Sequence, residues 1–479
     1  MAVSFPGFGG VPRALAVALR RPALRWPLVA AAAAGAGAAA AVLPPAQAAT
    51  WVVFAVAVAA AIRRPRTSIL LLTALLMLLP FAVVPFRAVV RPPIFETGLA
   101  LTLSVLALRA IRSPLRAPAV HWAVAGMLLA GAVSTALGAR AGASAEQLQY
   151  AAKLGLGVLA FFAGASLGTA AEFRLGLAKV IALAGAVQAA VASTLYLAGT
   201  GAEGFFEALA AAGYPPGETA LRYLPDGVTL RAIGTAVDPN VLGATLAVAL
   251  PIAIWLAANA ARGRRLAWSA AAALIALGIL LSFSRGAWIG AGAGVLLLTA
   301  LRRPRLAAGL LFVGALALLL PGGPGPLAHL RSGLLADDPA SALRLDEYRE
   351  AARVIASAPI FGVGFPAREP ASYFLGVSSV PLWIAERAGL LGAGLSILAV
   401  VLAFRGGWSG RAGGAGSRWP RDAASGAGMW AAALAAALFA GLVDHHFASI
   451  PHMAALFWLL AGVLAARPEE TPGSVARRA

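Results

Sequence analysis

Three arginines stand in settings where a guanidinium group could bind an anion. Arg231 begins a stretch that runs to Asp-Pro-Asn (238–240), Arg285 lies in a short Ser-Arg-Gly turn between two apolar runs, and Arg344 lies in a charged segment. The planar guanidinium presents a rigid fork of donors that matches phosphate oxygens, so three converging arginines would form a site for a diphosphate. The simpler alternative is that each arginine reaches lipid headgroups or pairs with a carboxylate. The available carboxylates are Asp238, Asp346 and Glu347.

Two adjacent histidines are the other candidates for chemistry. His445 and His446 follow Asp444 at the expected end of an apolar helix. Histidine titrates near neutral pH, and a neighbouring carboxylate can orient its ring, so this group suits a general base. A metal site is a second interpretation, but adjacent histidines rarely chelate one ion together, and we predict no metal and no cofactor. A third interpretation is that the histidines cap a helix or contact lipid phosphate.

The composition indicates which elements must position these residues. Of the 479 residues, 60% are hydrophobic and 12% are charged, and the chain contains no cysteine. Its mean hydropathy is +0.83. The apolar residues form continuous runs of about 17–25 residues, which is the length that crosses a bilayer as a helix. Because lipid offers no partner to an unpaired backbone group, these runs predict an all-α polytopic membrane protein.

We predict twelve to fourteen membrane spans within a single membrane domain that covers residues 1–479. The expected spans are 27–44, 48–62, 68–86, 94–108, 119–138, 150–168, 175–198, 236–258, 266–282, 286–301, 306–321, 381–404, 425–442 and 447–466. Two prolines, Pro239 and Pro251, fall inside the span 236–258 and predict a kinked or broken helix there.

The positions of the basic residues predict the orientation, because short arginine-dense loops mark the cytoplasmic side of a membrane. The arginine-dense segments are separated by even numbers of expected spans, so they lie on one side: 13–25, 63–66, 109–116, 174, 262–265, 302–305, 405–421 and 467–478. Both termini are therefore expected in the cytoplasm, and the loops 199–235 and 322–380 outside. The net charge of +19 then reflects topology and attraction to membrane lipid, so nucleic acid is not an expected partner.

The exterior loop 322–380 contains one expected amphipathic helix. Asp338 followed by Pro339 is typical of a helix start. Apolar residues then recur at helical spacing, at Leu345, Tyr348, Ala352 and Ile355. Pro359 is expected to end this helix.

Taken in order, these motifs resemble a known family. Arg231 with Asp238-Pro239-Asn240, the turn Ser284-Arg285-Gly286, and Arg344 followed by Pro359-Ile360-Phe361-Gly362-Val363-Gly364 match the pattern of the O-antigen ligase and O-antigen polymerase superfamily. Ala388-Gly389-Leu390-Leu391-Gly392 looks like the start of the span that follows the large periplasmic loop of that family. The resemblance covers residues 230–400.

The resemblance implies a metal-independent, inverting glycosyltransferase with a helical membrane fold of the GT-C type. Its donor would be a glycan on undecaprenyl diphosphate, and its acceptor would be a sugar hydroxyl on a glycan or on lipid A-core. Arg231, Arg285 and Arg344 would hold the diphosphate and stabilise the leaving group. The protein would lie in the inner (cytoplasmic) membrane with its site facing the periplasm, and a chain-length regulator is a possible partner.

The chain departs from the ligase pattern at one point. Ligases of this family carry a His-Asn pair late in the large loop, where this chain has Ser378-Ser379. A serine does not act as a base at neutral pH without help. The other groups that could activate the acceptor are His329, His445, His446, His452, Glu369 and Glu386. The missing pair favours a polymerase, or it leaves acceptor activation to one of these groups.

Two other functions stay open at this point. A flippase for lipid-linked glycans would fit a proline-broken helix, although the sequence has no clear inverted repeat. A peptidoglycan or cell-division polymerase would share the lipid diphosphate donor, but the order of motifs fits it less well. The absence of a GxxxxGK[ST] loop argues against a nucleotide-driven pump.

Overall fold

The computed structural model describes residues 63–83, 93–110, 118–140, 142–215, 220–224, 227–319, 339–365, 376–409 and 426–467. The expected spans 27–44 and 48–62 and both termini lie outside these residues. Within the described residues the chain is α-helical, with short 3-10 turns and two isolated backbone bridges, Val83–Pro93 and Tyr223–Leu230.

Within the described residues, each expected span from 68–86 onward coincides with one long helix, except that the span 447–466 also contains the short helix His446–Ser449. These helices are α4 (Pro65–Leu78), α5 (Ile94–Ala110), α6 (Ala119–Ala139), α7 (Ala145–Leu167), α8 (Ala171–Ala198), α11 (Pro239–Asn259), α12 (Arg262–Leu281), α13 (Arg285–Arg302), α14 (Pro304–Leu319), α17 (Val380–Ser409), α18 (Ala427–Gly441) and α20 (Pro451–Ala465). Six helices of the described chain are long and apolar enough to cross a membrane, and four more are apolar but shorter. The chain is therefore an all-α polytopic membrane protein, as the apolar runs predict.

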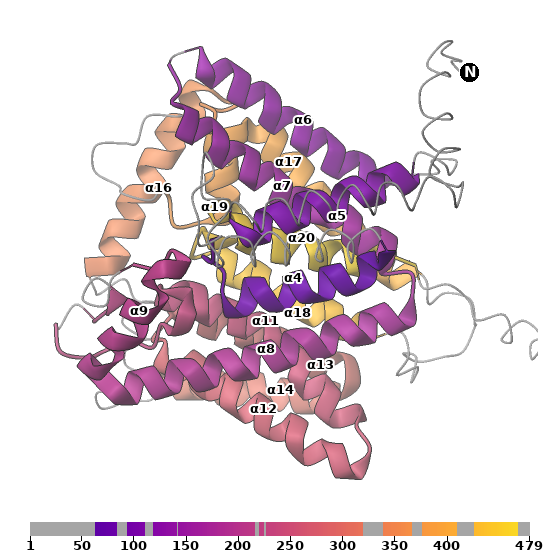
Figure 1. Ribbon diagram of the computed structural model, residues 1–479, viewed down its shortest axis with the longest axis vertical. Coiled ribbons are helices and arrows are strands. Elements are labelled where there is room, and N and C mark those ends of the chain that lie inside the picture. The colour runs from indigo at the N-terminus through magenta and orange to yellow at the C-terminus, as the bar shows by residue number, and fades with distance from the viewer. Residues whose placement is uncertain are drawn as a thin grey trace, which may run out of the picture.

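Helices α11, α18 and α20 lie in the middle of the bundle, and their side chains are almost entirely buried (Figure 1). Small residues permit the closest approach, which is a common basis for helix packing in membranes. A Cβ atom on Gly157 would lie 2.7 Å from the carbonyl oxygen of Pro451, and a Cβ atom on Gly164 would lie 3.0 Å from the backbone nitrogen of Val463. The backbones of α7 and α20 therefore pack directly against each other.

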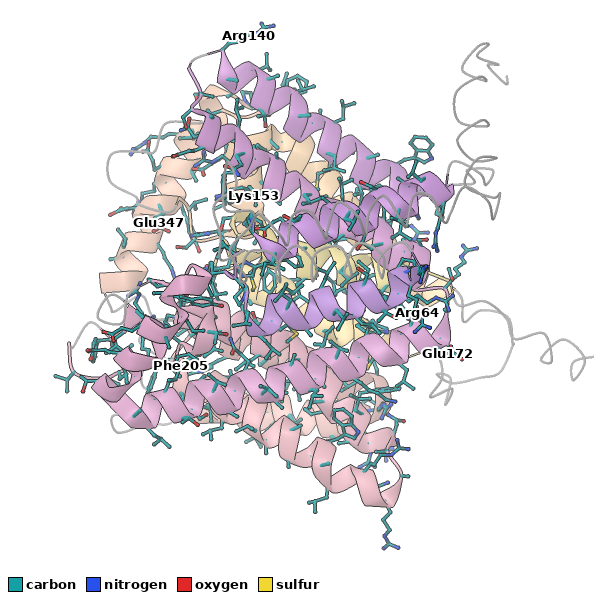
Figure 2. All side chains as sticks on the ribbon, viewed as in Figure 1. Arg64, Arg140, Lys153, Glu172, Phe205 and Glu347 are labelled. Atoms are coloured by element: carbon teal, nitrogen blue, oxygen red, sulfur yellow. The ribbon has the colours of Figure 1, made fainter. Side chains whose placement is uncertain are left out.

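The two ends of the bundle carry different polar residues. Glu347 and Phe205 lie at one end, whereas Arg64 and Glu172 lie at the opposite end (Figure 2). Arg174, near this second end, is buried with 3% exposure, and its Nη1 donates to the carbonyl oxygen of Val463 at 2.9 Å. The same atom donates to the carbonyl oxygens of Gly168 and Ala466, each at 3.3 Å. Arg174 thus joins the ends of α7, α8 and α20.

The start of α11 corrects one sequence expectation. Pro239 is the first residue of the helix and does not interrupt it, whereas Pro251 does lie inside. Asp238 caps the helix, because its Oδ1 accepts hydrogen bonds from the backbone nitrogens of Asn240 at 2.7 Å and Val241 at 3.0 Å. A proline at the first position needs no backbone donor, so Asp-Pro here is a helix start.

Helix α17 begins at Val380, one residue before the expected span 381–404, but it is interrupted inside. The break lies at Gly389, which has φ 70° and ψ −179°. The carbonyl groups freed at Glu386 and Arg387 accept hydrogen bonds from Val363 and Gly364, at 2.9 and 3.1 Å. Residues that follow α16 (Pro339–Ser357) therefore fill the break in this apolar helix.

The expected amphipathic helix is α16 (Pro339–Ser357), and it begins at the proline that the sequence indicates. Asp338 lies outside the described residues. The expected apolar face is partly wrong, because Leu345 is 48% exposed while Glu347 is buried with 9% exposure. Glu347 accepts a hydrogen bond from the backbone nitrogen of Ser378 at 2.9 Å, and Tyr348 donates to the carbonyl of the same residue at 3.2 Å. These polar bonds turn the 347–351 side of α16 toward α17.

Candidate active site

Arg231 connects two elements at the end of the bundle that carries α16. Its Nη2 donates to Oδ1 of Asn240 at 2.7 Å, and its Nε donates to the carbonyl oxygen of Ser282 at 3.0 Å. The first bond is to the initial turn of α11, and the second is to the turn between α12 and α13. Among the described residues, the hydrogen bonds of this half-buried guanidinium go to neutral oxygens and include no direct ion pair.

Arg285 is the first residue of α13 and follows the N-cap Ser284, whose hydroxyl accepts from the backbone nitrogen of Ala287 at 3.3 Å. The next residue, Gly286, allows this turn to pack closely against the end of α18. A Cβ atom at Gly286 would lie 3.1 Å from Val443 Cγ2 and 4.0 Å from the Cβ of Asp444. The Ser-Arg-Gly turn is thus held beside the residues that lead into the histidine pair.

The three arginines come together although they belong to separate segments. The pKa of Arg231 is lowered to about 10, mainly by burial. The carboxylate of Asp238 acts to raise this pKa, and the positive charges of Arg285 and Arg344 act to lower it. Arg285 and Arg344 therefore both lie within electrostatic reach of Arg231, and like charges are costly to hold together unless an anion joins them.

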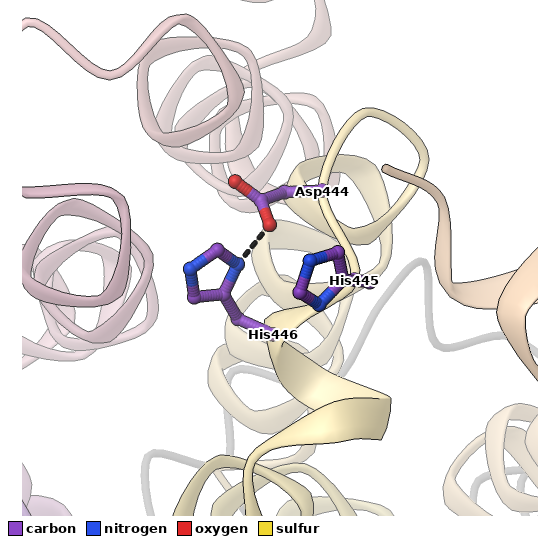
Figure 3. A group of neighbouring side chains, drawn as sticks. All are labelled: Asp444, His445 and His446. Atoms are coloured by element: carbon purple, nitrogen blue, oxygen red, sulfur yellow. Dashed lines mark hydrogen bonds and ion pairs between the residues drawn. The ribbon is translucent and has the colours of Figure 1, made fainter. Parts of the chain in front are cut away.

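The histidines form a compact group with Asp444 (Figure 3), and Asp238 lies next to it. Nδ1 of His446 hydrogen-bonds to Oδ1 of Asp444, and its Nε2 lies 3.4 Å from Oδ1 of Asp238. The rings of His445 and His446 stack, with centroids 5.0 Å apart and planes 12° from parallel. Nδ1 of His445 is 2.6 Å from the hydroxyl of Ser449. Both histidines are buried, and these neighbours fix the orientation of their rings.

The electrostatic environment gives these groups defined charges. For Asp238, burial acts to raise the pKa, but hydrogen bonding and charge from His446 and the backbone donors of α11 outweigh it and lower the pKa to about 2. Burial lowers the pKa of His445 to about 4, and Arg387 adds to this effect while Asp238 opposes it. At neutral pH Asp238 is therefore ionised and His445 is neutral.

Asp444, His445 and His446 are the described residues that could hold a metal ion, since one ligand atom from each lies within 4.8 Å of the others. Two of these side chains already bond to each other. The carboxylate and imidazole groups suit either proton transfer or metal binding, and the hydrogen bond between Asp444 and His446 orients one ring.

The other candidates for acceptor activation lie in α20, in α17 or outside the described residues. His452 is buried in α20 and meets the ring of Phe81 edge-on, with centroids 5.3 Å apart. Glu386 is buried at the break in α17. His329 and Glu369 lie outside the described residues.

Sequence reasoning missed two relationships. The sequence pairs Asp238 with an arginine, and the charge of Asp238 does act on Arg231, but its carboxylate also lies 3.4 Å from Nε2 of His446. Arg387 was not considered, although its charge reaches His445. Its sequence signal was weak: the aromatic Trp383 lies one helical turn earlier, and the guanidinium lies 5.8 Å from that ring.

The fold and this cluster define a polytopic membrane protein with a cationic, imidazole-containing site at one end of its helices. The family model described as O-antigen ligase matches residues 270–384, from α12 into α17. This match supports assignment of the chain to the O-antigen ligase and polymerase superfamily, and it indicates glycosyl transfer between a lipid-linked glycan and an acceptor. Arg285 and Arg344 lie inside the matched segment, whereas Arg231 and the histidines lie outside it. No curated protein matches the chain.

Proposed function

We propose that this protein transfers or polymerises a glycan from undecaprenyl diphosphate onto the hydroxyl of an acceptor sugar. The observation that carries the proposal is the convergence of Arg231, Arg285 and Arg344 beside a histidine pair. Three guanidinium groups would bind the diphosphate and neutralise the charge that grows on it as it leaves. They would supply the positive charge without a metal ion.

In the proposed reaction, the acceptor oxygen attacks the anomeric carbon from the face opposite the diphosphate. The new carbon–oxygen bond forms as the bond from carbon to the phosphate oxygen breaks, and the bonding pair leaves with the lipid diphosphate. The hydroxyl proton passes to Nε2 of His446, whose other nitrogen is held by Asp444. Asp238, 3.4 Å from Nε2, would stabilise the imidazolium, and His445 would support the ring by stacking.

The proposed orientation follows from the basic loops. Both termini would lie in the cytoplasm, and the site would face the periplasm from the inner membrane. Residues 1–479 would form one membrane domain of the GT-C type, in which the loops 199–235 and 322–380 contribute to the exterior surface. A polymerase would also be compatible with a separate protein partner that regulates the length of the glycan chain.

Incubation of the purified protein with a synthetic undecaprenyl-diphosphate oligosaccharide tests the proposal. A ladder of longer lipid-linked glycans without any further acceptor would identify a polymerase. A single transfer that requires a lipid A-core acceptor would identify a ligase. If no glycosidic bond forms under either condition and the labelled lipid crosses reconstituted vesicles, the protein is a flippase and the proposal is wrong.

Variants of the arginines test the site itself. We expect Arg231→Ala, Arg285→Ala and Arg344→Ala each to lower the rate of transfer by at least about a hundredfold, which is the scale of lost electrostatic stabilisation of a leaving group. Arg349→Ala is the matched control, because Arg349 lies on α16 at the surface and pairs with Asp346 at 2.8 Å. Rates for the three variants equal to the control rate would refute the diphosphate site.

A further inference from the structure

Arg387 is a fourth arginine near the histidines, and its donors are little used. It lies in α17 two residues before the break at Gly389. Its Nη1 makes one long hydrogen bond, 3.5 Å, to the carbonyl oxygen of Phe365, and its guanidinium lies 5.8 Å from the ring of Trp383. Its Nε is buried and has no hydrogen-bond partner among the described residues. A buried donor without a partner is costly, so this fork is suited to receive an anion.

The surroundings of Arg387 connect it to the histidine pair. The short helix α19 (His446–Ser449) packs on α17, where Ala448 lies against the cluster that contains Trp383. The hydroxyl of Tyr150, on α7, hydrogen-bonds to the carbonyl oxygen of Ser449. The charge of Arg387 acts on both Tyr150 and His445. The guanidinium therefore belongs to the same site as the imidazoles.

The contacts also give an order across the site. Arg231 interacts with Asp238 and with the other two arginines, Asp238 approaches His446, and His446 stacks on His445. Arg387 acts on His445, and its guanidinium lies over Trp383, whose cluster contacts Ala448 of α19. One cationic group thus lies on the Asp238 side of the two rings, and a second lies on the His445 side.

We propose that the guanidinium of Arg387 binds a phosphate group of the acceptor substrate. This inference rests on the proposed function. An inverting transfer brings the acceptor hydroxyl to the sugar on the face opposite the departing diphosphate, so an anion carried by the acceptor belongs on the far side of the base. The phosphate could be on a core oligosaccharide or in the diphosphate of a second lipid-linked glycan, and the shared chemistry is a phosphate ester near the accepting sugar.

The backbone and the side chain of Arg387 have separate roles, so the side chain can be changed without loss of the backbone contacts. The carbonyl oxygen of Arg387 accepts hydrogen bonds from Gly364 and from the hydroxyl of Ser134, and it holds the break in α17. Replacement of the side chain leaves these bonds in place. Arg387→Gln removes the charge, and Arg387→Lys keeps the charge but removes the fork. Arg349→Gln is the surface control.

Steady-state transfer with each variant would use two acceptors that differ only in the phosphate group. We expect Arg387→Gln to raise the KM for the phosphorylated acceptor at least about tenfold, the scale of a lost charged hydrogen bond, with kcat changed less. Arg387→Lys should fall between this variant and the wild type. With the dephosphorylated acceptor, the KM of the wild type should already be as high as that of Arg387→Gln with the phosphorylated acceptor. Arg387→Gln should not raise the KM for the dephosphorylated acceptor any further. Parallel assays with a phosphorylated core glycan and with a prenyl-diphosphate glycan as acceptor identify which of the two carries the phosphate that Arg387 binds.

An equal effect of Arg387→Gln on both acceptors would overturn the inference, and so would a loss of affinity for farnesyl diphosphate, used as a probe of the donor site. Binding of the phosphorylated acceptor without donor, measured by calorimetry, separates this inference from the proposed function. If the wild type binds that acceptor and Arg387→Gln does not, the site is real even when no glycosidic bond forms. If both bind it equally, Arg387 is structural and the inference is wrong.

Discussion

Nε2 of His446 lies 3.4 Å from Oδ1 of Asp238, the same oxygen that caps helix α11. The contact joins α19, which lies between α18 and α20, to the N-cap of α11, which follows Arg231. One carboxylate therefore fixes the beginning of a buried helix and balances an imidazole. This relationship links the proposed base to the proposed diphosphate site.

Substitution of Asp238 separates its two roles, which are to cap α11 and to place a negative charge beside His446. Asparagine caps helices about as well as aspartate, so Asp238→Asn should leave the melting temperature close to that of the wild type. It removes the negative charge beside His446, and we expect transfer to slow by about tenfold or more. Asp238→Ala should slow transfer similarly and also cost about 1 kcal/mol of stability through the lost cap. A wild-type rate for Asp238→Asn, measured with the purified protein, would contradict the role of the carboxylate.

The stability of the protein should fall in mild acid because of His445. Its folded pKa of about 4 is below the ordinary value of 6.5, so the folded state favours the neutral ring. This stability is fully present above pH 6.5 and is lost as the pH falls from about 6.5 to about 4, where only the unfolded chain binds the proton. The lowered pKa of Asp238 acts in a more acidic range, since that carboxylate protonates near pH 2.

Thermal unfolding in detergent at pH 7 and pH 5 measures this effect. We expect His445→Gln, whose amide can still bond to Ser449, to reduce the difference in melting temperature between the two values of pH. The charged or titratable groups that face His445 are Asp238, Arg387, Asp444 and His446, and they are unchanged in the variant. An unchanged pH dependence would show that another group controls acid sensitivity.

The break in α17 predicts a strong effect at Gly389 and a weak one nearby. Gly389 has φ 70°, and a Cβ atom there would lie 2.6 Å from the backbone nitrogen of Phe361, with the carbonyl of Ile360 closer still. Gly389→Ala should destabilise the protein by at least about 2 kcal/mol. Gly394 lies in the same helix with no heavy atom within 4 Å of its Cβ position. Gly394→Ala should therefore leave the melting temperature unchanged or raise it, and equal losses for both variants would argue against the break.

Arg174 should matter for stability more than for topology. Arg174→Met removes the donor to the carbonyl oxygens at the ends of α7 and α20, and we expect a loss of about 2 kcal/mol. Arg264→Met is the control, because Arg264 is exposed near the start of α12. The measurement is the melting temperature of the two variants. A normal melting temperature for Arg174→Met, together with altered membrane insertion, would show that Arg174 directs the membrane orientation and does not stabilise the fold.

The helices could be predicted from the sequence because the length of an apolar run determines whether it can cross a bilayer. The break at Gly389 could not, since glycine is common within membrane helices and the deciding contact comes from Ile360 in a distant loop. The orientation of α16 was missed for a related reason. Helical spacing favours Leu345 for the buried face, but the backbone of Ser378 binds Glu347 and turns the helix.

The candidate site was partly visible in the sequence. Arg231, Arg285 and Arg344 could be grouped because their motifs have a recognisable order, and the structure does bring their charges together. The pairing of Asp238 with His446 could not be predicted, because it depends on where the fold places α19 relative to the start of α11. Arg387 has no motif of its own, and only the fold brings it to His445.

The surroundings of Arg387 also couple two parts of the chain that are separated in sequence. The carbonyl oxygen of Phe365 lies 3.5 Å from Nη1 of Arg387, and a Cβ atom on Gly376 would lie 4.0 Å from its Nη2. The backbone nitrogen of Gly364 donates to the carbonyl oxygen of Arg387 as well. One residue next to the break in α17 therefore contacts the chain on both sides of 366–375, so any movement of α17 at Gly389 would displace both positions together.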